Sequence, residues 1–572
     1  MIDYRDIIAS EIFSDELGLS KDEIKSMIEI PSDESMGDFA FPCFRLAKTM
    51  RKSPQIIAAD IAEKISVCNI FYKVEQVNAY VNVFINPSHI AENVVYEINK
   101  LGSEYGKSEI GQGKNIIVDF SSPNIAKPFH IGHIRSTVIG NSICKLYEAL
   151  GYNVIGVNHL GDYGTQFGKM IVAYRKWGKE EELVKEPIKT LLGYYTKFHE
   201  EAEKDPSLDD EAREAFVRLE EGCEEEVELW EKFREYSLEE FNRVYKMLGI
   251  TFDSYAGESF YSDKIPAVVE ELKNKNLLEE SQGAQIVDLE EYDLGAAMIM
   301  KSDGSSLYVT RDIATAIYRK NTYNFAKNLY VVASQQNLHF KQWKKVLNLM
   351  GYDWEKDCIH VPFGLVSLED GEILSTRKGK VIFLEDLLKN AVAKTKDIML
   401  EKNPDIPEID TISREVGIGA VIFQELSNNR IKDYVFTWDK VLNFDGETGP
   451  YVQYTHVRAS GILRNSTEDE INKAKEGTCD YSYLSGESAF RLIKLLYRVP
   501  EVIEDAANRY EPSILTRHLV EISQLFNKFY HDEHILVDNK DERIAKLSLV
   551  MATKIVIANS LALLGINAPE RM

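Results

Sequence analysis

The stretch that decides the fold is Asn115-Ile-Ile-Val-Asp-Phe120, followed by Ser121-Ser-Pro-Asn-Ile-Ala-Lys-Pro-Phe-His-Ile-Gly-His133. The apolar hexapeptide predicts a short buried strand, and the segment with two prolines predicts an irregular loop. From His133 apolar residues recur with helical spacing as far as Gly151, and Asn153-Val-Ile-Gly-Val-Asn158 supplies another strand. This strand-loop-helix-strand order predicts a parallel sheet whose ligands bind at the carboxyl ends of its strands.

The loop carries the features of a phosphate site. His130-Ile-Gly-His133 places two imidazoles three residues apart where the loop enters the helix. Gly132 allows close backbone approach, and a helix start offers unpaired N–H groups to a polyphosphate. The imidazoles can donate to an α-phosphate, and Lys127 adds a nearby charge. An isolated His-x-x-His pair also fits a partial zinc site or two surface residues, but no third ligand follows at zinc spacing. We therefore expect no protein-bound metal.

A second basic loop, Gly371-Glu-Ile-Leu-Ser-Thr-Arg-Lys-Gly-Lys380, precedes a helix expected to start near Leu384. Small and cationic, it could close over a triphosphate and supply charge to a leaving pyrophosphate. A basic turn flanked by glycines is more often a solvated loop. The phosphate interpretation therefore depends on its pairing with the histidine segment.

Composition predicts a multidomain globular protein without a secretory signal. The chain has 572 residues, 44% apolar and 28% charged, which suggests three to five domains. The acidic N-terminus lacks the basic and apolar regions of a signal peptide, and the six cysteines form no Cys-x-x-Cys pair. We expect a cytoplasmic protein, no membrane partner and no structural metal.

The net charge of −25 is unevenly distributed. Between Glu200 and Glu231 there are 15 acidic residues against Lys204, Arg213 and Arg218, a net −12 in that stretch. Such a run is most often a solvated helical face. Basic residues elsewhere can still cluster, so the overall sign does not exclude a nucleic-acid partner.

Periodicity outlines the remaining organisation. Residues 1–110 predict a small α/β appendage with a β-like run at Val77–Ile85, and residues 166–247 predict a charged helical insertion. Beyond Asp386 the pattern is nearly all helical, with boundaries expected at Pro450 and Pro500. Further strands are expected at Ala284–Asp288, Met298–Met300, Leu307–Val309, Leu329–Val332 and Cys358–Val361.

Together, the histidine segment and the basic loop resemble the HIGH and KMSKS signatures of class I aminoacyl-tRNA synthetases. Further stretches make the chain similar to arginyl-tRNA synthetases over essentially its whole length. They are Asp119-Phe-Ser-Ser-Pro-Asn-Ile-Ala-Lys127, Asn158-His-Leu-Gly-Asp-Tyr-Gly-Thr-Gln-Phe-Gly168, Tyr308-Val-Thr-Arg-Asp-Ile313, Val332-Ala-Ser-Gln-Gln336, Gly449-Pro-Tyr-Val-Gln-Tyr-Thr-His-Val-Arg458 and Ala568-Pro-Glu-Arg-Met572.

The resemblance implies a multidomain α/β plus all-α fold. It places an N-terminal domain that touches the tRNA elbow at 1–110, and a Rossmann-type catalytic domain with a helical insertion (about 170–250) at 111–385. A C-terminal α-helical anticodon-binding domain would follow at 386–572. The implied partners are ATP with Mg²⁺, L-arginine and tRNA(Arg), and the implied product is arginyl-tRNA, formed through an arginyl-adenylate with release of AMP and pyrophosphate. We expect a monomer, and the resemblance further suggests that tRNA binds before arginine is activated.

The resemblance also distributes roles among the residues. The implied catalytic set is Lys127, His130, His133, Arg377 and Lys378, and the ATP set is His130, Gly132, His133, Ser375, Thr376 and Arg377. A guanidinium needs carboxylates and flat or hydroxylated neighbours, and the family assigns Tyr308 and Asp312 to it, with Glu258 a third candidate. Asp119, Ser122, Asn124 and Gln336 would hold the α-amino and α-carboxylate groups. Tyr451, Gln453, Tyr454, His456 and Arg458 mix stacking groups with donors, which suits unpaired bases but equally suits helix packing.

One departure from the family pattern bears on mechanism. Ile373 and Thr376 stand where the two lysines of KMSKS are expected, with Arg377 and Lys378 just beyond. In this family a lysine ahead of the HIGH segment is thought to take over the missing role, and Lys127 stands there. Two alternatives remain at this stage: a related class I synthetase or tRNA-independent ligase, and a non-catalytic RNA-binding relative.

Overall fold

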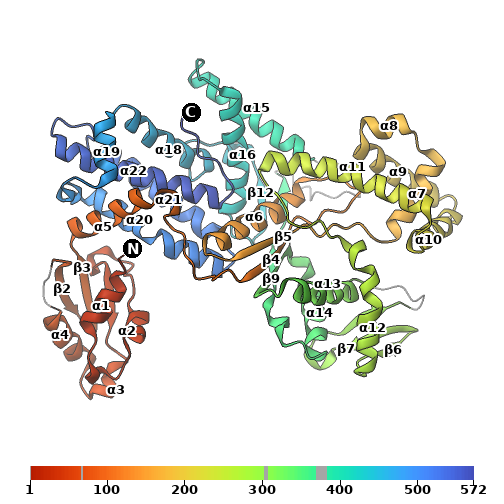
Figure 1. Ribbon diagram of the computed structural model, residues 1–572, viewed down its shortest axis with the longest axis horizontal. Coiled ribbons are helices and arrows are strands. Elements are labelled where there is room, and N and C mark those ends of the chain that lie inside the picture. Colours follow the sequence, from red (N-terminus) through yellow and green to blue (C-terminus); the bar gives the residue numbers. More distant parts are fainter. Residues whose placement is uncertain (1, 66–68, 302–306, 369–382) are drawn as a thin grey trace.

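A parallel four-stranded sheet lies at the centre of the molecule (Figure 1). The computed structural model describes residues 2–65, 69–301, 307–368 and 383–572. The strand order is β10-β9-β4-β5, with every neighbouring pair parallel. The strands are β4 (Asn115–Asp119), β5 (Asn153–Val157), β9 (Lys327–Ala333) and β10 (Cys358–Phe363). The parallel sheet predicted from the sequence is confirmed.

Helix α6 (Ile134–Ala149) makes the crossover from β4 to β5 and packs closely on the sheet. Ile116, Ile117 and Val118 of β4 are fully buried, as expected for a parallel strand covered on both faces. At Gly140 of α6 a Cβ atom would lie 2.2 Å from Cβ of Phe120, so only glycine permits this approach. The helix start is thereby held against the end of β4.

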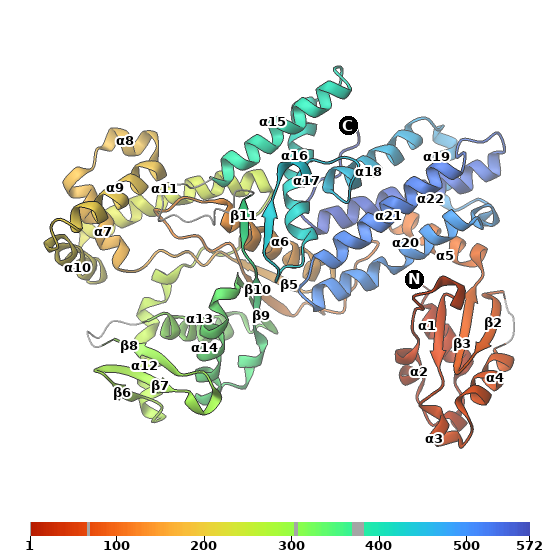
Figure 2. The same cartoon turned by 180° about the vertical axis from the view of Figure 1, so that it is seen from behind.

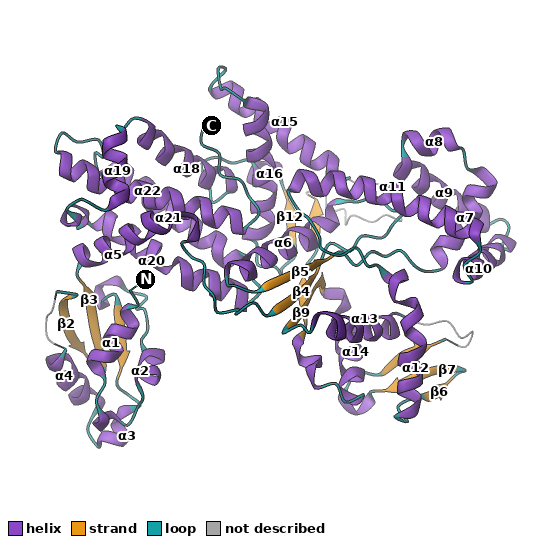
Figure 3. Ribbon diagram, viewed as in Figure 1, coloured by secondary structure: helices purple, strands orange, loops and turns teal. Residues whose placement is uncertain are grey.

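The charged segment after β5 forms a separate group of helices at one end of the molecule (Figure 3). It has an apolar core of its own, with Ile171, Leu191, Phe198 and Phe233 fully buried. The predicted helical insertion is confirmed, divided at Gly178, Glu186 and other breaks. The helices are α7 (Thr165–Trp177), α8 (Glu180–Lys185), α9 (Pro187–Ala202), α10 (Ser207–Glu220) and α11 (Glu224–Leu248).

A second sheet and three helices follow the insertion. The sheet is antiparallel, in the order β6-β7-β8, and two of its strands match the predicted ones. The predicted strand at Leu307–Val309 is wrong, because α13 starts at Tyr308 and buries Val309, Ile313 and Ala316 at helical spacing. The elements are α12 (Ile265–Asn274), β6 (Glu279–Ser281), β7 (Ala284–Asp288), β8 (Ala296–Met300), α13 (Tyr308–Tyr323) and α14 (Asn337–Leu349).

The N-terminal part is a three-stranded antiparallel sheet with helices, set apart below the helical bundle in Figure 1. Val77–Ile85 is not one strand: β2 ends at Val77, Asn78 turns in the left-handed region (φ 53°), and β3 begins at Tyr80. Asparagine tolerates that conformation, so a hairpin forms. The elements are α1 (Tyr4–Ile12), α2 (Lys21–Met27), β1 (Phe39–Pro42), α3 (Leu46–Met50), α4 (Pro54–Lys64), β2 (Phe71–Val77), β3 (Tyr80–Ile85) and α5 (Pro87–Leu101).

The C-terminal part is a helical bundle against which α5 packs, as Figure 2 shows from behind. Pro450 lies in the first turn of α18, but the boundary expected at Pro500 is wrong, because α20 continues through it and buries Leu496 and Ile503 on either side. The elements are β11 (Val366–Leu368), α15 (Leu384–Lys402), α16 (Ile409–Ser427), β12 (Tyr434–Phe436), α17 (Trp438–Val441), α18 (Gly449–Arg464), α19 (Glu468–Glu476), α20 (Glu487–Asn508), α21 (Ser513–Asp532) and α22 (Lys540–Leu563).

Among the described residues, α22 alone has the length and hydropathy of a membrane span. In its most apolar window 78% of the residues are buried inside the structure. Core helices of globular proteins meet the same criteria, so α22 is explained by its packing.

Replacing Gly140 by alanine should destabilise the part of the protein built on the central parallel sheet. The new methyl group would collide with the base of the Phe120 side chain, which cannot rotate away, and overpacking of this kind costs about 1–3 kcal/mol. Gly193→Ala in α9 is the matched control, because nothing lies within 4 Å of its Cβ position and alanine favours a helix by roughly 1 kcal/mol. Urea unfolding followed by circular dichroism measures both variants, and equal midpoints for Gly140→Ala and wild type would contradict the packing argument.

Candidate active site

The loop between β4 and α6 is held in a strained conformation. Ser121 (φ 69°), Ser122 (φ 47°) and Ala126 (φ 57°) all adopt the left-handed region, at a cost of about 1–3 kcal/mol each. The Ser121 hydroxyl lies 2.8 Å from both the Thr137 hydroxyl and the Tyr245 hydroxyl. These buried contacts anchor the start of the loop.

Two further serines anchor the loop from different helices. The N–H of Ser121 donates to Oγ of Ser136 in α6 (2.9 Å), and the N–H of Ala126 donates to Oγ of Ser237 in α11 (2.8 Å). Sequence reasoning missed these anchors. Ser237 and Tyr245 of α11 lie more than a hundred positions away along the chain, and Ser136 and Thr137 of α6 lie 15 and 16 positions from Ser121.

The two histidines form a compact pair at the start of α6. His130 caps the short turn Ile131–His133, since Gly132 N–H donates to Nδ1 of His130 (3.1 Å). The N–H of His130 in turn donates to Nδ1 of His133 (3.2 Å), and the ring centroids are 4.1 Å apart. Because Nδ1 of His130 accepts, its neutral ring carries the proton on Nε2. Nδ1 of His133 lies equally close to the His130 carbonyl (3.2 Å), so this atom can accept from the His130 N–H or donate to the His130 carbonyl. A Cβ on residue 132 would lie 2.8 Å from Cε1 of His130, so any residue other than glycine would displace the His130 ring.

Burial keeps this pair uncharged. Burial lowers the pKa of His130, and burial together with the neighbouring His130 lowers the pKa of His133 to about 3. Each ring is therefore neutral and carries one N–H donor near the amino end of a helix, which favours an anion.

The chain that follows the basic loop lies directly beside the first histidine. Phe383 forms an isolated β-bridge with His130, and Leu384 N–H donates to the Phe129 carbonyl (2.9 Å). The predicted helix start at Leu384 is confirmed. The loop candidates Ile373, Ser375, Thr376, Arg377 and Lys378 lie outside the described residues.

Lys127 is half-buried between the histidines and the insertion. Its Nζ lies 5.9 Å from the ring centroid of Tyr195 in α9. Its charge contributes to lowering the pKa of His133 and also opposes the rise in the pKa of Glu258. Lys127 therefore lies within electrostatic reach of both the histidine pair and a carboxyl group across the site.

Two of the three predicted guanidinium partners, Glu258 and Tyr308, contact Arg311 of the protein itself. Tyr308 and Asp312 lie one turn apart at the start of α13, and Tyr308 is 65% exposed. Nη1 of Arg311 lies 3.4 Å from Oε2 of Glu258, and its Cζ lies 5.6 Å from the Tyr308 ring centroid. Burial raises the pKa of Glu258 to about 7, and Arg311 works against that rise. The cluster can therefore hold a guanidinium between carboxylates and an aromatic face.

Other members of the predicted site stand at the carboxyl ends of β4 and β9. Asp119 is buried and its oxygens are used internally: Oδ2 pairs with Nη2 of fully buried Arg319 (2.8 Å), and Oδ1 accepts from Oγ of Ser122 (2.9 Å). Asn124 is exposed beside Gly161, where a Cβ would lie 1.9 Å from its Oδ1. Gln336 is exposed in the turn after β9.

Two partners in this region carried no sequence signal. Arg319 supports Asp119 from the far end of α13, and Nε2 of His339 in α14 hydrogen-bonds Oδ2 of Asp312. Both contacts join separate elements, so only the packed structure brings them together.

The five predicted tRNA-contact residues of α18 divide into two groups. Gln453 is fully buried and its amide donates to the Asn567 carbonyl (2.8 Å), and His456 is buried with Nδ1 2.8 Å from the Pro569 carbonyl. The expectation that these two side chains face RNA is wrong, because they bind the C-terminal segment of the chain itself. Tyr454 is 40% exposed, with the Arg458 guanidinium 5.0 Å from its ring, and Tyr451 is half-buried.

Comparison with family models places this architecture among the tRNA synthetases. Residues 97–438 match the model described as tRNA synthetases class I (R), catalytic domain. Residues 452–572 match the DALR anticodon binding domain, and residues 4–85 match the arginyl tRNA synthetase N terminal domain. The parallel sheet with its histidine pair is thus the catalytic domain of a class I aminoacyl-tRNA synthetase.

Relatives along the whole chain narrow the class further. The chain is 57% identical over 572 residues to the arginine–tRNA ligase of Halothermothrix orenii, with 100% of each chain covered. It is 56% identical over 554 residues to that of Clostridioides difficile, with 97% of each covered. The chain belongs to the arginyl-tRNA synthetase family.

Solved structures of the family share the fold. Arginyl-tRNA synthetase from Thermus thermophilus matches with a TM-score of 0.81 at 22% identity, covering 100% of this chain and 99% of that one. The enzyme from Plasmodium falciparum matches with a TM-score of 0.78 at 25% identity, covering 95% and 94%. The three-part architecture is therefore that of the family.

Proposed function

We propose that the protein ligates L-arginine to tRNA(Arg) in two steps. The arginine carboxylate attacks the α-phosphorus of ATP, forming arginyl-adenylate and releasing pyrophosphate. The arginyl group then passes to a terminal ribose hydroxyl of the tRNA, and AMP leaves. The observation that carries this proposal is the neutral histidine pair at the start of α6, together with Glu258 and Tyr308 around the guanidinium of Arg311 and with Asp312 one helical turn from Tyr308. It supports phosphate chemistry and arginine selection in one site.

The histidine segment serves the nucleotide in this proposal. The Nε2–H groups of His130 and His133 donate to the α-phosphate oxygens as charge develops there, and Gly132 keeps the backbone close. The loop residues Ser375, Thr376, Arg377 and Lys378 serve the outer phosphates. The described residues contain no cluster of three or more His, Cys, Asp or Glu able to hold a metal. We therefore propose that Mg²⁺ enters bound to the phosphates of ATP, as this ion often does.

The carboxyl ends of the strands serve the amino acid. Asp312 and Glu258 pair with the substrate guanidinium, and Tyr308 covers its face. Ser122, Asn124 and Gln336 hold the α-amino and α-carboxylate groups. Asp119 orients Ser122 through the 2.9 Å hydrogen bond between them, and Arg319 neutralises the charge of the Asp119 carboxylate from the other side.

The remaining proposals concern tRNA and organisation. Tyr451, Tyr454 and Arg458 present stacking and donor groups to the anticodon, within a helical anticodon-binding domain at 386–572. The catalytic domain occupies 111–385, and the N-terminal domain at 1–110 binds the tRNA elbow. We propose a monomer, and a cytoplasmic enzyme without a membrane partner; the five described cysteines are unpaired thiols, as is usual in a reducing compartment.

Exchange of labelled pyrophosphate into ATP tests the function directly. We expect exchange that depends on arginine and on added tRNA(Arg), because only the adenylate step is reversible with pyrophosphate. A tRNA-independent ligase would exchange equally well without tRNA. Absence of exchange under both conditions would defeat the enzyme assignment, and exchange with a different amino acid would defeat the specificity.

Lys127→Ala should slow adenylate formation. Removing the positive charge of Lys127, which would stabilise the negative charge that develops on the α-phosphate, should reduce the rate by roughly 10²–10³. The KM for arginine should change less. Lys197→Ala is the matched control, because its Nζ also lies over an aromatic ring of the insertion, 4.9 Å from that of Trp177, but carries no proposed role. Single-turnover adenylate formation measures both variants, and a near-normal rate in Lys127→Ala would refute the role.

The KM for arginine should fall as pH rises from 6 to 8. Burial raises the pKa of Glu258 from its ordinary value to about 7, so below pH 7 the carboxyl is largely protonated and cannot pair with a guanidinium. Glu258→Gln should raise the KM and flatten its pH dependence. Glu240→Gln is the matched control, because burial also raises the pKa of Glu240 to about 7 but Glu240 has no proposed role in arginine binding. This variant should therefore keep the wild-type dependence of KM on pH. The same slope in Glu258→Gln and wild type would contradict the assignment.

A further inference from the structure

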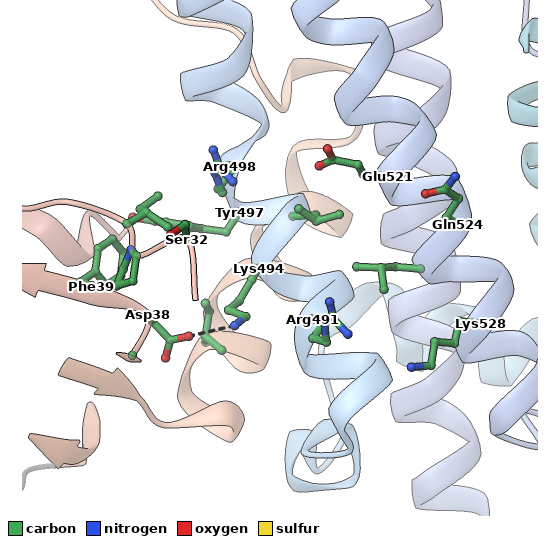
Figure 4. A pocket seen from close by; sticks show the side chains of 16 residues that line it. Ser32, Asp38, Phe39, Arg491, Lys494, Tyr497, Arg498, Glu521, Gln524 and Lys528 are labelled. Carbon is green, nitrogen blue, oxygen red and sulfur yellow. Dashed lines mark hydrogen bonds and ion pairs between the residues drawn. The ribbon is translucent and has the colours of Figure 1, made fainter. Parts of the chain in front are cut away.

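A cleft of about 640 Å³ lies where the N-terminal part meets the C-terminal bundle (Figure 4). Residues of the 30–39 segment line one side, and the facing surfaces of α20 and α21 line the other. The cleft is remote from the histidine pair, because none of its lining residues belongs to the central sheet or to α6.

The cleft concentrates positive charge in a protein whose net charge is −25. Arg491, Lys494 and Arg498 recur at three- and four-residue spacing on one face of α20, and Lys528 faces them from α21. The acidic lining residues are Asp38 and Glu521. Four cations against two carboxylates leave a net positive surface.

The ion pairs within the cleft leave part of that charge available. Nζ of Lys494 pairs with Oδ1 of Asp38 (3.0 Å), which joins the N-terminal part to α20. In the described part of the chain, Nε of Arg498 is buried and has no hydrogen-bond partner. Arg498 lines the cleft and its donors are not all paired among the residues that the structure describes, so its guanidinium can donate to an acceptor on a ligand there.

The aromatic groups of the cleft are already engaged. The Tyr497 hydroxyl accepts from Tyr4 N–H (3.2 Å), and its ring packs edge-on to Tyr4 with centroids 5.4 Å apart. Phe39 is 5% exposed and also contacts the Tyr4 ring. The cleft therefore offers donors but no stacking platform, which suits phosphates rather than unpaired bases.

Helix α21 connects the cleft to the anticodon surface proposed above. Asn527 donates to the Tyr451 hydroxyl (3.0 Å) and hydrogen-bonds Arg458, and the Arg458 guanidinium lies 5.0 Å from the Tyr530 ring. Lys528, between these two positions, lines the cleft. One helix thus carries a surface for bases and a neighbouring surface for phosphates.

We propose that this cleft binds backbone phosphates of the tRNA body, with Arg498 and Lys528 as the principal contacts and the other cations of α20 alongside. The inference rests on the tRNA binding proposed above and adds a site between the two tRNA-binding domains. It contributes affinity without reading sequence, because phosphates carry no base identity.

The salt dependence of tRNA binding tests the site. The slope of log K against log salt is negative, and each lost phosphate contact reduces its magnitude by about 0.7–0.9. The Arg498→Gln/Lys528→Gln double variant should therefore reduce this magnitude by roughly 1.4–1.8 and raise the KM for tRNA about tenfold or more. Its kcat at saturating tRNA should match wild type. Lys273→Gln, an exposed lysine on α12, is the control and should change neither value.

A charge-conserving variant separates binding from folding. Arg498→Lys/Lys528→Arg should keep the wild-type slope, whereas a purely structural role would lower affinity in this variant too. An unchanged slope in the glutamine variant would overturn the proposal. Equilibrium dialysis with inorganic phosphate gives a second test. If phosphate binds the wild type but not the glutamine variant, while both bind tRNA with the same affinity, the cleft binds a free phosphate compound and the proposal is overturned. Failure of the proposed enzyme function can be distinguished from failure of the cleft proposal, since in the first case the wild type would show no arginine-dependent exchange of pyrophosphate into ATP.

Discussion

The strained loop between β4 and α6 is the constraint on which the active site depends. Its left-handed residues are unfavourable in isolation, and they persist because buried hydroxyl groups satisfy the backbone and side chains around them. Two of those hydroxyls, on Ser237 and Tyr245, come from α11. The helical insertion therefore does more than present a solvated acidic face: its inner side holds the loop that presents the histidines.

Charge in the site is controlled by burial more than by ion pairs. The histidine rings are kept neutral by desolvation, so each presents one defined donor to a phosphate. The buried ion pair at the carboxyl end of β4, Asp119 with Arg319, lies behind Ser122. Such a pair contributes little net stability, but removing either partner would leave a buried charge uncompensated. In this site the ion pair fixes the position of the Asp119 carboxylate.

The distribution of charge explains how a protein of net charge −25 can have RNA as a partner. The acidic run belongs mainly to α10 and α11 at one end of the molecule, whereas cations line α20 and α21 beside the N-terminal part. Exposed charges are screened beyond about 8 Å at physiological ionic strength, so RNA responds to the local surface rather than to the total. The bundle surface and the acidic insertion therefore act independently.

The sequence by itself determined the parallel sheet, the helical insertion and the histidine turn, because apolar periodicity and glycine placement act over a few neighbouring residues. Local reasoning failed where packing prevailed: Leu307–Val309 is strand-like in composition but begins a helix that buries Val309, and α20 passes through Pro500. It failed likewise for Gln453 and His456, whose amide and imidazole bind the C-terminal segment of the chain.

Only the tertiary structure decided which groups meet. The α11 anchors of the strained loop, the Arg319 support of Asp119 and the cleft between α20 and the N-terminal part all join residues far apart along the chain. Contacts of that kind leave no periodic or local trace in a sequence. They arise because folding brings polar groups of different elements together in the interior, where most such groups need a hydrogen-bond or charged partner.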